Sequence, residues 1–461
     1  MSETDLRSFL QFVREHCPQE YVRLEKEVSP QWELAAIVAR LEGALRAPVI
    51  ECVRVGGTEL PVVTNVCASL PRIARSIGRA ERELEDMLAG AYDRPIPPRL
   101  WAGASAAPVR QQVLQGDAVD LSRLPQMRYT EVETAPYLTA AAVVARDPDS
   151  GVLNVSYHRL MICGRNTTGI FMAPGGHLHA IHGKNSASDT DTPVAVFLGA
   201  HPLWSLGGLA AGGLELDEFG IIGALLGSGL EVVPGMLDPR LRVPARAEIV
   251  LEGRIRHDRW VDEGPFGEFA GYAMPRAPQP VFEVTLLSHR DHPVFQDIVA
   301  GRAEHLTMTG VALRAHLERM LRRAYPAGIL ELYLPAPTTL FVKLDKSRLG
   351  GRDVDELMRE VLTSQLYLKH LVCFDPDIEL RSLQRTEWAV ATRAQIERDL
   401  VVVPDRPGTG LDPSERDGKT TKWGLDATAK PDLEHYAPRN RVPQHVLDRI
   451  DLRDILRREA P

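Results

Sequence analysis

The sequence predicts an α/β protein of three parts, in which a largely β middle part separates two parts of mixed helix and strand. Its 461 residues correspond to roughly three domains at ~150 residues each. Helix and strand patterns alternate over the first hundred residues, strand patterns dominate the middle third, and alternation returns after about residue 303. We therefore place the domains at residues 1–110, 111–302 and 303–461.

Local patterns place individual elements within the first two parts. The first part contains a helix pattern at residues 32–46, a β-rich run at Leu60–Val66 and a proline-rich segment, Arg94–Pro108, that predicts a linker or arm. In the middle part, strands at Tyr137–Arg146 and Val152–Cys163 flank the turn sequence DPDSG. Further strands are predicted at Ala247–Ile255 and Val281–Ser288.

The last part shows the alternation of an α/β domain. Helices are predicted at residues 304–325 and 354–369, and strands at residues 338–344 and 370–374. The segment Arg406–Asp426 is rich in glycine, proline, aspartate and lysine, and we expect it to wrap over another surface.

Composition excludes several classes of protein. The formal net charge of −8 argues against nucleic acid as a partner. Five scattered cysteines without a CxxC pair predict neither a disulfide framework nor a zinc-cysteine site. No apolar run approaches the ~20 residues that span a bilayer, and the charged start lacks the apolar run of a signal peptide. We expect a cytoplasmic protein that does not bind membranes.

The segment Val261–Tyr272, VDEGPFGEFAGY, is the first candidate for chemistry. Glu263 and Glu268 flank a Gly-Pro-Phe-Gly turn, whose tight path can bring both carboxylates to one cavity. Carboxylates that share a cavity repel each other, which raises the pKa of one and suits it to general acid catalysis. The alternative is an exposed acidic loop, which the dense glycine and proline context disfavours.

Two further segments carry candidate polar sites. In Asn154–Arg159, NVSYHR, strand alternation places Asn154, Ser156 and His158 on one face and Arg159 on the other, unless the strand bulges. This pattern predicts a cavity wall or, alternatively, a polar strand edge.

In the second segment, GGHLHAIH, three histidines resemble a metal cluster: His177, His179 and His182. Alternatively the Gly-Gly pair starts a helix whose N–H groups receive a phosphate, with His179 and His182 on the surface. In GRAEH, Arg302 and His305 either bind a second polar group of a substrate or only begin a helix.

These segments together resemble the UbiD family of prenylated-flavin-dependent decarboxylases, over residues 110–431. The resemblance rests on Asn-x-Ser-x-x-Arg at residues 154–159, His177 eighteen residues later, and the Glu-Gly-Pro-Phe-Gly-Glu block at 263–268. It also rests on PARAEIVLEGR at 244–254 and Lys-x-Gly-x-Asp-Ala-Thr at 422–428.

The resemblance implies a fold, a cofactor and partners. The fold has an N-terminal α/β domain, a central split β-barrel related to flavin reductases, and a C-terminal α/β domain that builds homodimers or larger homo-oligomers. The cofactor is prenylated FMN supplied by a flavin prenyltransferase, with its phosphate held by a divalent metal, usually manganese, often with potassium nearby. The substrate is a small carboxylic acid, and CO2 is released.

The resemblance also implies roles for individual residues. The catalytic network consists of Arg159, Glu263 and Glu268. The cofactor contacts are Asn154, Ser156, Tyr157, His158, Arg159 and His177, of which Asn154 and His177 also bind the metal. The family's third metal ligand is a glutamate, whose place falls here near Met236. A thioether is a poor ligand for a hard ion, so Asp238 is the candidate replacement.

The predicted function is reversible, non-oxidative decarboxylation of an aromatic, heteroaromatic or α,β-unsaturated acid. Decarboxylation needs an electron sink, which the cofactor supplies. Arg159 is expected to hold the substrate carboxylate, Glu268 to donate the proton that replaces CO2, and Glu263 to orient Arg159. Two alternatives are a flavin-binding accessory homologue with impaired cofactor maturation and a metallohydrolase built on the histidine cluster.

Overall fold

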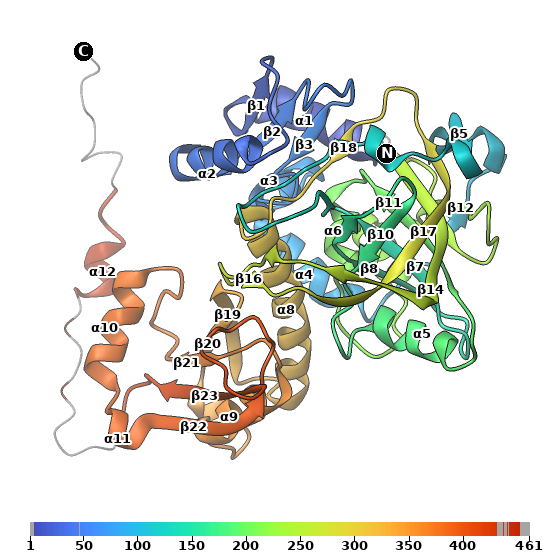
Figure 1. The fold of residues 1–461 in the computed structure, drawn as a ribbon. Coiled ribbons are helices and arrows are strands. Elements are labelled where there is room, and N and C mark those ends of the chain that lie inside the picture. The colour runs from blue at the N-terminus through green and yellow to red at the C-terminus, as the bar shows by residue number, and fades with distance from the viewer. Residues whose placement is uncertain (1–3, 46, 431–436, 438–439, 441, 452–461) are drawn as a thin grey trace, which may run out of the picture.

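The computed structural model describes residues 4–45, 47–430, 437, 440 and 442–451. Its chain forms an N-terminal region, a central region around a large curled sheet, and a C-terminal α/β region set to one side (Figure 1). The order of these regions agrees with the three-part α/β prediction. No helix in the described ranges has the length and apolar character needed to cross a membrane.

The N-terminal region packs helices around a small sheet. Its helices are α1 (Leu6–His16), α2 (Glu33–Leu45), α3 (Leu70–Ser76) and α4 (Glu81–Ala91), and its strands are β1 (Tyr21–Leu24), β2 (Val49–Cys52) and β3 (Val62–Thr64). The fourth strand is β18 (Phe295–Gln296), which pairs in parallel with β3. A strand from near residue 300 therefore belongs spatially to the first part of the chain.

The central sheet has the strand order β6-β9-β10-β17-β14-β11-β7-β8, with β5 paired to β17. The strands are β5 (Gln112–Gln115), β6 (Tyr137–Leu138), β7 (Ala142–Arg146), β8 (Leu153–Tyr157), β9 (Leu160–Ile162), β10 (Thr167–Ile170), β11 (Thr192–Leu198), β14 (Ile249–Glu263) and β17 (Ala277–His289). Short neighbouring strands are β4 (Arg99–Leu100), β12 (Glu231–Pro234), β13 (Arg242–Pro244), β15 (Phe266–Gly267) and β16 (Ala273–Met274). Three helices accompany them: α5 (His177–Ser186), α6 (Pro202–Gly208) and α7 (Glu218–Leu226).

The chain crosses between the two ends of this sheet. The β7–β8 hairpin forms at the predicted DPDSG turn, where Asp147 accepts hydrogen bonds from the backbone and side chain of Ser150. The predicted strand Val152–Cys163 is divided into two strands. Strand β8 forms one edge of the sheet, whereas β9 lies next to the strand at the opposite edge. Only His158 and Arg159 separate the two strands. The sheet therefore curls until its edges face each other, and these two residues span the opening.

The arm at Arg94–Pro108 is not wholly irregular, because β4 pairs with β12 in parallel.

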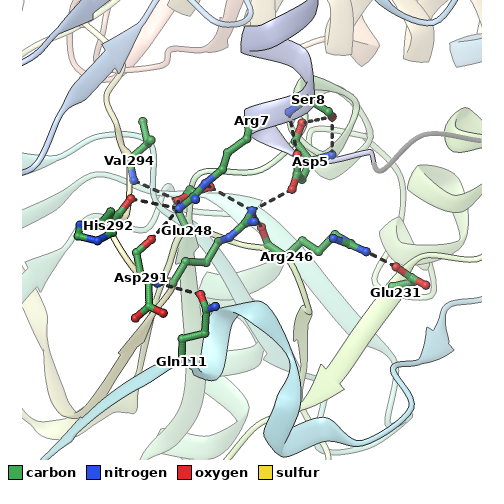
Figure 2. A network of polar contacts seen from close by, with 11 residues as sticks. Asp5, Arg7, Ser8, Gln111, Glu231, Arg246, Glu248, Asp291, His292 and Val294 are labelled. Atoms are coloured by element: carbon green, nitrogen blue, oxygen red, sulfur yellow. Dashed lines mark hydrogen bonds and ion pairs between the residues drawn. The ribbon is translucent and has the colours of Figure 1, made fainter.

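The motif PARAEIVLEGR has a structural function at the start of β14. Its Glu248 is fully buried and accepts hydrogen bonds from Arg7, Arg290 and the backbone of Val294 (Figure 2). Asp5 pairs with Arg290 at 2.8 Å, so the network fastens α1 to the central sheet.

The C-terminal region has a five-stranded sheet in the order β19-β20-β21-β23-β22. Its elements are α8 (Ala303–Ala324), β19 (Ile329–Ala336), β20 (Thr339–Leu344), α9 (Val354–Ser364), β21 (His370–Phe374), α10 (Leu383–Arg393), α11 (Ile396–Asp399), β22 (Leu400–Pro407), β23 (Lys419–Asp426) and α12 (Gln444–Leu447).

Two expectations for this region are wrong. The helix predicted at 354–369 ends at Ser364, and Gln365–Lys369 forms a loop into β21. The segment Arg406–Asp426 does not wrap over another surface, because β22 and β23 pair as an antiparallel hairpin within the sheet. Much of the tail after Lys430 lies outside the described residues.

Candidate functional site

Arg159 stands between Glu263 and Glu268 at the opening of the curled sheet. Its Nε and one terminal nitrogen donate to the two oxygens of Glu263, each at 2.9 Å. Its other terminal nitrogen donates to Oε1 of Glu268. The three residues predicted from the sequence as a catalytic network are therefore in direct contact.

Aromatic rings hold the guanidinium from two sides. Its carbon lies 4.1 Å from the ring centre of Phe171 and 4.6 Å from that of Phe266. A planar cation gains electrostatic attraction from such rings, particularly where water is excluded. Gly169 allows its strand to lie close to Val261 and Glu263, because a Cβ at this glycine would lie 2.8 Å from the Val261 side chain and 3.5 Å from that of Glu263. Arg159 is therefore fixed by its shape as well as by its charge.

The two glutamates have different environments. The side chain of Glu263 is 1 % exposed and both of its oxygens are bound to Arg159. The side chain of Glu268 is 13 % exposed and accepts from Arg159 through one oxygen. Burial, the largest single effect, would lower the pKa of Arg159, but the hydrogen bonds and charge of Glu263 together with the charge of Glu268 raise it. This arrangement makes Glu263 the fixed counterion and Glu268 the carboxylate that can reach a ligand.

The polar side chains that strand alternation places on one face of β8 are linked by hydrogen bonds. Ser156 Oγ lies 3.1 Å from Asn154 Oδ1 and 2.9 Å from His158 Nε2. His158 Nδ1 lies 2.8 Å from the carbonyl oxygen of Phe171, which can only accept, so the ring proton is on Nδ1. Burial lowers the pKa of His158 to about 4, which keeps the ring neutral.

Asn154 meets His177 and a glutamate that the sequence analysis did not single out, Glu218. Asn154 Nδ2 lies 3.1 Å from His177 Nδ1 and 2.9 Å from Glu218 Oε1. His177 Nε2 donates to the carbonyl of Gly212 at 2.9 Å, which leaves Nδ1 facing Glu218 at 3.4 Å. The hydrogen bond with Glu218 raises the pKa of His177, and burial raises the pKa of Glu218.

The hydrogen-bond pattern around Asn154 fits a cation. As placed, the single hydroxyl proton of Ser156 must serve both Asn154 Oδ1 and His158 Nε2. Turning the Asn154 amide by 180° removes this conflict, because its nitrogen then donates to Ser156 and Ser156 donates to His158. The amide oxygen would then face His177 Nδ1 and Glu218 Oε1, and three acceptors that face one another are satisfied by a bound cation or by a proton on His177. An amide oxygen, an imidazole and a carboxylate are suitable ligands for a divalent metal.

Glu218 is the third residue that lies in this group, whereas Asp238 is engaged elsewhere. Asp238 forms a 2.7 Å ion pair with Arg240, and Met236 is 41 % exposed. Glu218 begins helix α7, which is otherwise almost entirely apolar. The carboxylate of Glu218 is 1 % exposed in the structure. The sequence alone did not predict that this side chain is buried beside Asn154 and His177. In sequence, it resembles an ordinary acidic residue in the first turn of a helix.

The histidines of GGHLHAIH do not converge. The helix α5 does begin at His177, after Gly176 as its N-cap. His179 is exposed, whereas His182 is buried and hydrogen-bonds Thr192 at 3.0 Å. Within the described part of the chain, the one set of three His, Cys, Asp or Glu ligand atoms within 4.8 Å is Asp191, His257 and Asp258. The hydrolase alternative therefore lacks its metal cluster.

The remaining predicted residues divide between the site and its surroundings. The Tyr157 hydroxyl lies 2.7 Å from Ser205 on α6, so its side chain packs against that helix. His305 lies near Glu268: burial lowers its pKa, and the charge of Glu268 opposes this shift. The backbone N–H of Gly301 donates to His305 Nδ1 at 3.2 Å, which leaves its proton on Nε2. Arg302 is exposed at the start of α8.

A cavity of about 970 Å³ lies beside this site, between the central and C-terminal regions. On one side it is lined by Phe269, Ala270 and Tyr272, in the turn that directly follows Glu268. The C-terminal region contributes residues 366–369 and 411–415, α8 contributes further lining residues, and the N-terminal region contributes residues 68–71. The cavity provides space for a ligand beside Phe269, the residue that follows Glu268, while Arg159 and Glu268 themselves are not among its lining residues.

The chain matches three family descriptions in succession. These are the 3-octaprenyl-4-hydroxybenzoate carboxy-lyase N-terminal domain at residues 18–90, the Rift-related domain at 102–303 and the C-terminal domain at 306–427. All three belong to UbiD, and together they cover most of the chain.

Solved structures agree with these matches. The UbiD-class enzyme HmfF from Pelotomaculum thermopropionicum, in complex with FMN, is 35% identical over 98% of this chain and 100% of its own, with a TM-score of 0.88. An evolved dimeric form of HmfF with prFMN is 33% identical over the same shares, with a TM-score of 0.84. The closed form of Sedimentibacter hydroxybenzoicus vanillic acid decarboxylase is 25% identical over 99% and 100%, with a TM-score of 0.87. The chain therefore belongs to the UbiD family and is a carboxy-lyase.

Proposed function

We propose that this enzyme carries out reversible, non-oxidative decarboxylation of an aromatic, heteroaromatic or α,β-unsaturated carboxylic acid with prenylated FMN. The observation that carries the proposal is the guanidinium of Arg159, held by the buried Glu263 on one side and touching the more accessible Glu268 on the other. FMN and prFMN in the two HmfF structures support the choice of cofactor.

Arg159 is the group that would bind the substrate carboxylate. Its terminal nitrogens are donors suited to a carboxylate, and Phe171 and Phe266 hold its plane. Glu263 uses both oxygens to keep the guanidinium in place, so we assign it to positioning.

Glu268 is our candidate for the proton donor. When the bond between the substrate carbon and its carboxylate breaks, CO2 leaves and the carbon needs one proton. A protonated Glu268 would supply this proton and would then take another from solvent before the next cycle. In the reverse direction, the same carboxylate would remove the proton from carbon before CO2 adds.

The bound cofactor would serve as the electron sink for the carbon that loses CO2. The residues that would hold it lie along β8 and at the start of α5: Asn154, Ser156, Tyr157, His158, Arg159 and His177. We propose Asn154, His177 and Glu218 as ligands of the divalent metal, with manganese as the expected ion and potassium as a second one. The free N–H groups at the start of α5 add positive potential for a phosphate.

The substrate enters this proposal only as a class. His305 lies near Glu268 and could donate through Nε2 to a second polar group of the substrate. Arg302, which is exposed, is a weaker candidate for that contact. A flavin prenyltransferase would supply the cofactor, and the evolved dimeric form of HmfF agrees with an expected homo-oligomer.

Co-expression with a flavin prenyltransferase tests the proposal. We expect purified protein to contain modified flavin and manganese, to release CO2 from at least one acid in a panel, and to exchange deuterium into the decarboxylated product. Bound flavin with neither CO2 release nor exchange would instead favour the accessory-homologue alternative. Protein that retains no flavin at all would contradict the cofactor assignment.

A further inference from the structure

Lys422 is a buried lysine whose charge has no carboxylate partner in the described part of the chain. It is 2 % exposed, and none of the described carboxylates lies within 4.0 Å of its Nζ. Nζ instead donates to the backbone carbonyls of Gln365, at a very short distance, and Leu366, at 3.1 Å. A buried ammonium is costly unless it is well hydrogen-bonded, so these two carbonyls are essential partners.

The two carbonyls belong to the loop between α9 and β21. Gln365 caps α9 by donating its backbone N–H to Val361 at 3.1 Å, whereas Leu368 is fully buried. Between them, Leu366 and Tyr367 are 41 % and 38 % exposed and line the interdomain cavity. The loop thus presents two apolar side chains to the cavity, and Lys422 holds its backbone from behind.

Tyr367 connects this loop to the catalytic residues. Its ring centre lies 6.2 Å from that of Phe269, the residue after Glu268, in an edge-to-face arrangement. Phe269 also meets His305 edge-to-face at 5.9 Å. The aromatic contacts therefore run from the loop of the C-terminal region to the turn that carries Glu268.

The second lysine of this cavity has a different function. Lys369 Nζ binds Asp412, Ser414 at 3.1 Å and Thr420 at 2.6 Å, and so holds the loop between β22 and β23. Lys422 makes none of these contacts among the described residues. The two lysines thus fix two separate walls of the cavity.

We propose that Lys422 is a positioning residue, which holds the Gln365–Leu366 backbone and thereby places Tyr367 in the cavity wall beside Phe269 and Glu268. This inference rests on the proposed function, and it takes the cavity lined by Phe269 and Tyr367 as the place where the substrate binds. It gives the Lys-x-Gly-x-Asp-Ala-Thr motif a part in shaping that site. The glycine of the motif, Gly424, lies against Met358, since a Cβ there would be 2.8 Å from its sulfur.

The first test follows Tyr367 without any cofactor. The chain has ten tyrosines, so 19F NMR of 3-fluorotyrosine-labelled protein can be read residue by residue, with Tyr367→Phe identifying the resonance. We expect Lys422→Met to shift or broaden the Tyr367 signal and Lys422→Arg to restore it. Lys419→Met is the matched control, because Lys419 lies on the same strand, is exposed and pairs with Asp405. An unchanged Tyr367 signal in folded Lys422→Met would overturn the proposal.

The second test is kinetic. We expect Lys422→Met to lower kcat/KM by roughly 10- to 100-fold, mainly through KM, because a displaced wall binds the substrate less well. Tyr367→Ala should cause a similar loss, and the double variant should be no worse than Tyr367→Ala alone, since both act through one contact. Additive losses would show that Lys422 acts elsewhere. If the unmodified enzyme turns over no acid, the proposed function fails while the NMR result still stands.

A pH series covers the case in which Lys422→Met does not fold. Burial, with the nearby charges of Arg406 and Lys369, lowers the pKa of Lys422 to about 8. The Tyr367 signal of the unmodified chain should therefore move as the pH rises through about 8, while the same signal in Lys422→Arg stays constant. This series is read on tyrosine labelled with 13C in the ring, because fluorination would make the phenol more acidic, and burial raises the pKa of Tyr367 itself, which keeps its own titration above this range. Asp412, another charged residue that lines the cavity, is paired with Lys369, and the charge of Glu268 adds to the rise in the pKa of Tyr367. Equal pH dependence in both proteins would contradict the proposal.

Discussion

Arg159 and Glu263 form a two-pronged ion pair in which both hydrogen bonds measure 2.9 Å and both side chains are at least nine-tenths buried. The carboxylate cannot rotate without breaking both bonds, and the guanidinium is packed between two aromatic rings. This pair fixes the direction in which the remaining nitrogen of Arg159 points, toward Glu268.

Removal of Arg159 should destabilise the fold as well as stop turnover. In Arg159→Met, Glu263 would remain 1 % exposed without its partner, and breaking a buried pair in this way costs about 3–5 kcal/mol. Urea unfolding of the apoprotein measures this loss. The double variant Arg159→Met/Glu263→Leu should recover most of the stability but no activity. A double variant as unstable as Arg159→Met would show that the unpaired charge is not the cause.

Replacing Glu268 by glutamine should abolish turnover and leave the fold intact. The amide keeps the size of the side chain, and its oxygen can still accept from Arg159, but it cannot deliver a proton to carbon. Thermal unfolding and flavin content should match those of the unmodified enzyme, while CO2 release and deuterium exchange disappear. Full decarboxylation by this variant would remove Glu268 as the proton donor.

Substitutions of Glu218 and of Asp238 should have different effects on the manganese content of the enzyme. Glu218→Gln should lower manganese content and flavin retention, because the carboxylate that lies 2.9 Å from Asn154 and 3.4 Å from His177 loses its charge. The loss in metal affinity should be at least 10-fold. Asp238→Asn should leave both quantities unchanged, since this carboxylate is engaged by Arg240. Elemental analysis distinguishes the two, and the reverse result would restore Asp238 as the ligand.

Glu304 should make stability depend on pH. It is fully buried, accepts the backbone N–H groups of Asn65 and Cys67 at 2.7 Å, and burial raises its pKa from 4.5 to about 7. The folded chain therefore binds more protons than the unfolded chain between these values, and stability from this group falls as the pH rises from 4.5 to 7.

The expected contribution across that window is about 3 kcal/mol. It is measured as the difference in unfolding free energy between the unmodified chain and Glu304→Gln, because the other titrating groups then largely cancel. Burial also raises the pKa of Asp297 to about 6. Because Asp297 is present in both proteins, its contribution largely cancels in the difference. A difference that does not change with pH would mean that Glu304 ionises normally in the fold.

The local parts of this structure could be predicted from the sequence. The hairpin at DPDSG, the long helix α8 and the strands β20 and β21 follow from turn residues and from apolar periodicity, which act over a few positions. The polar face of Asn154, Ser156 and His158 follows from strand alternation in the same way. The residues that we propose for catalysis, Arg159, Glu263 and Glu268, were predicted from their motifs.

Other features required contacts between distant segments. Nothing in the segment 354–369 marks the end of α9 at Ser364, because the loop that follows is held by Lys422 from another strand. The hairpin of β22 and β23 was mistaken for a wrapping tail because its turn residues dominate the composition. Glu218 was missed because it is separated from His177 by about forty residues and from Asn154 by more than sixty.

By itself, the sequence determined the three-part α/β architecture and the types of residue available for chemistry. Both follow from patterns and motifs of residues that are near one another along the chain. Only the tertiary structure decided which of those residues meet. Arg159 reaches Glu263 because the curled sheet brings the end of β8 to the end of β14, and Glu218 joins Asn154 and His177 because α7 packs against β8. The choice of Glu218 over Asp238 depends on distances in space, and the order of residues along the chain does not fix those distances.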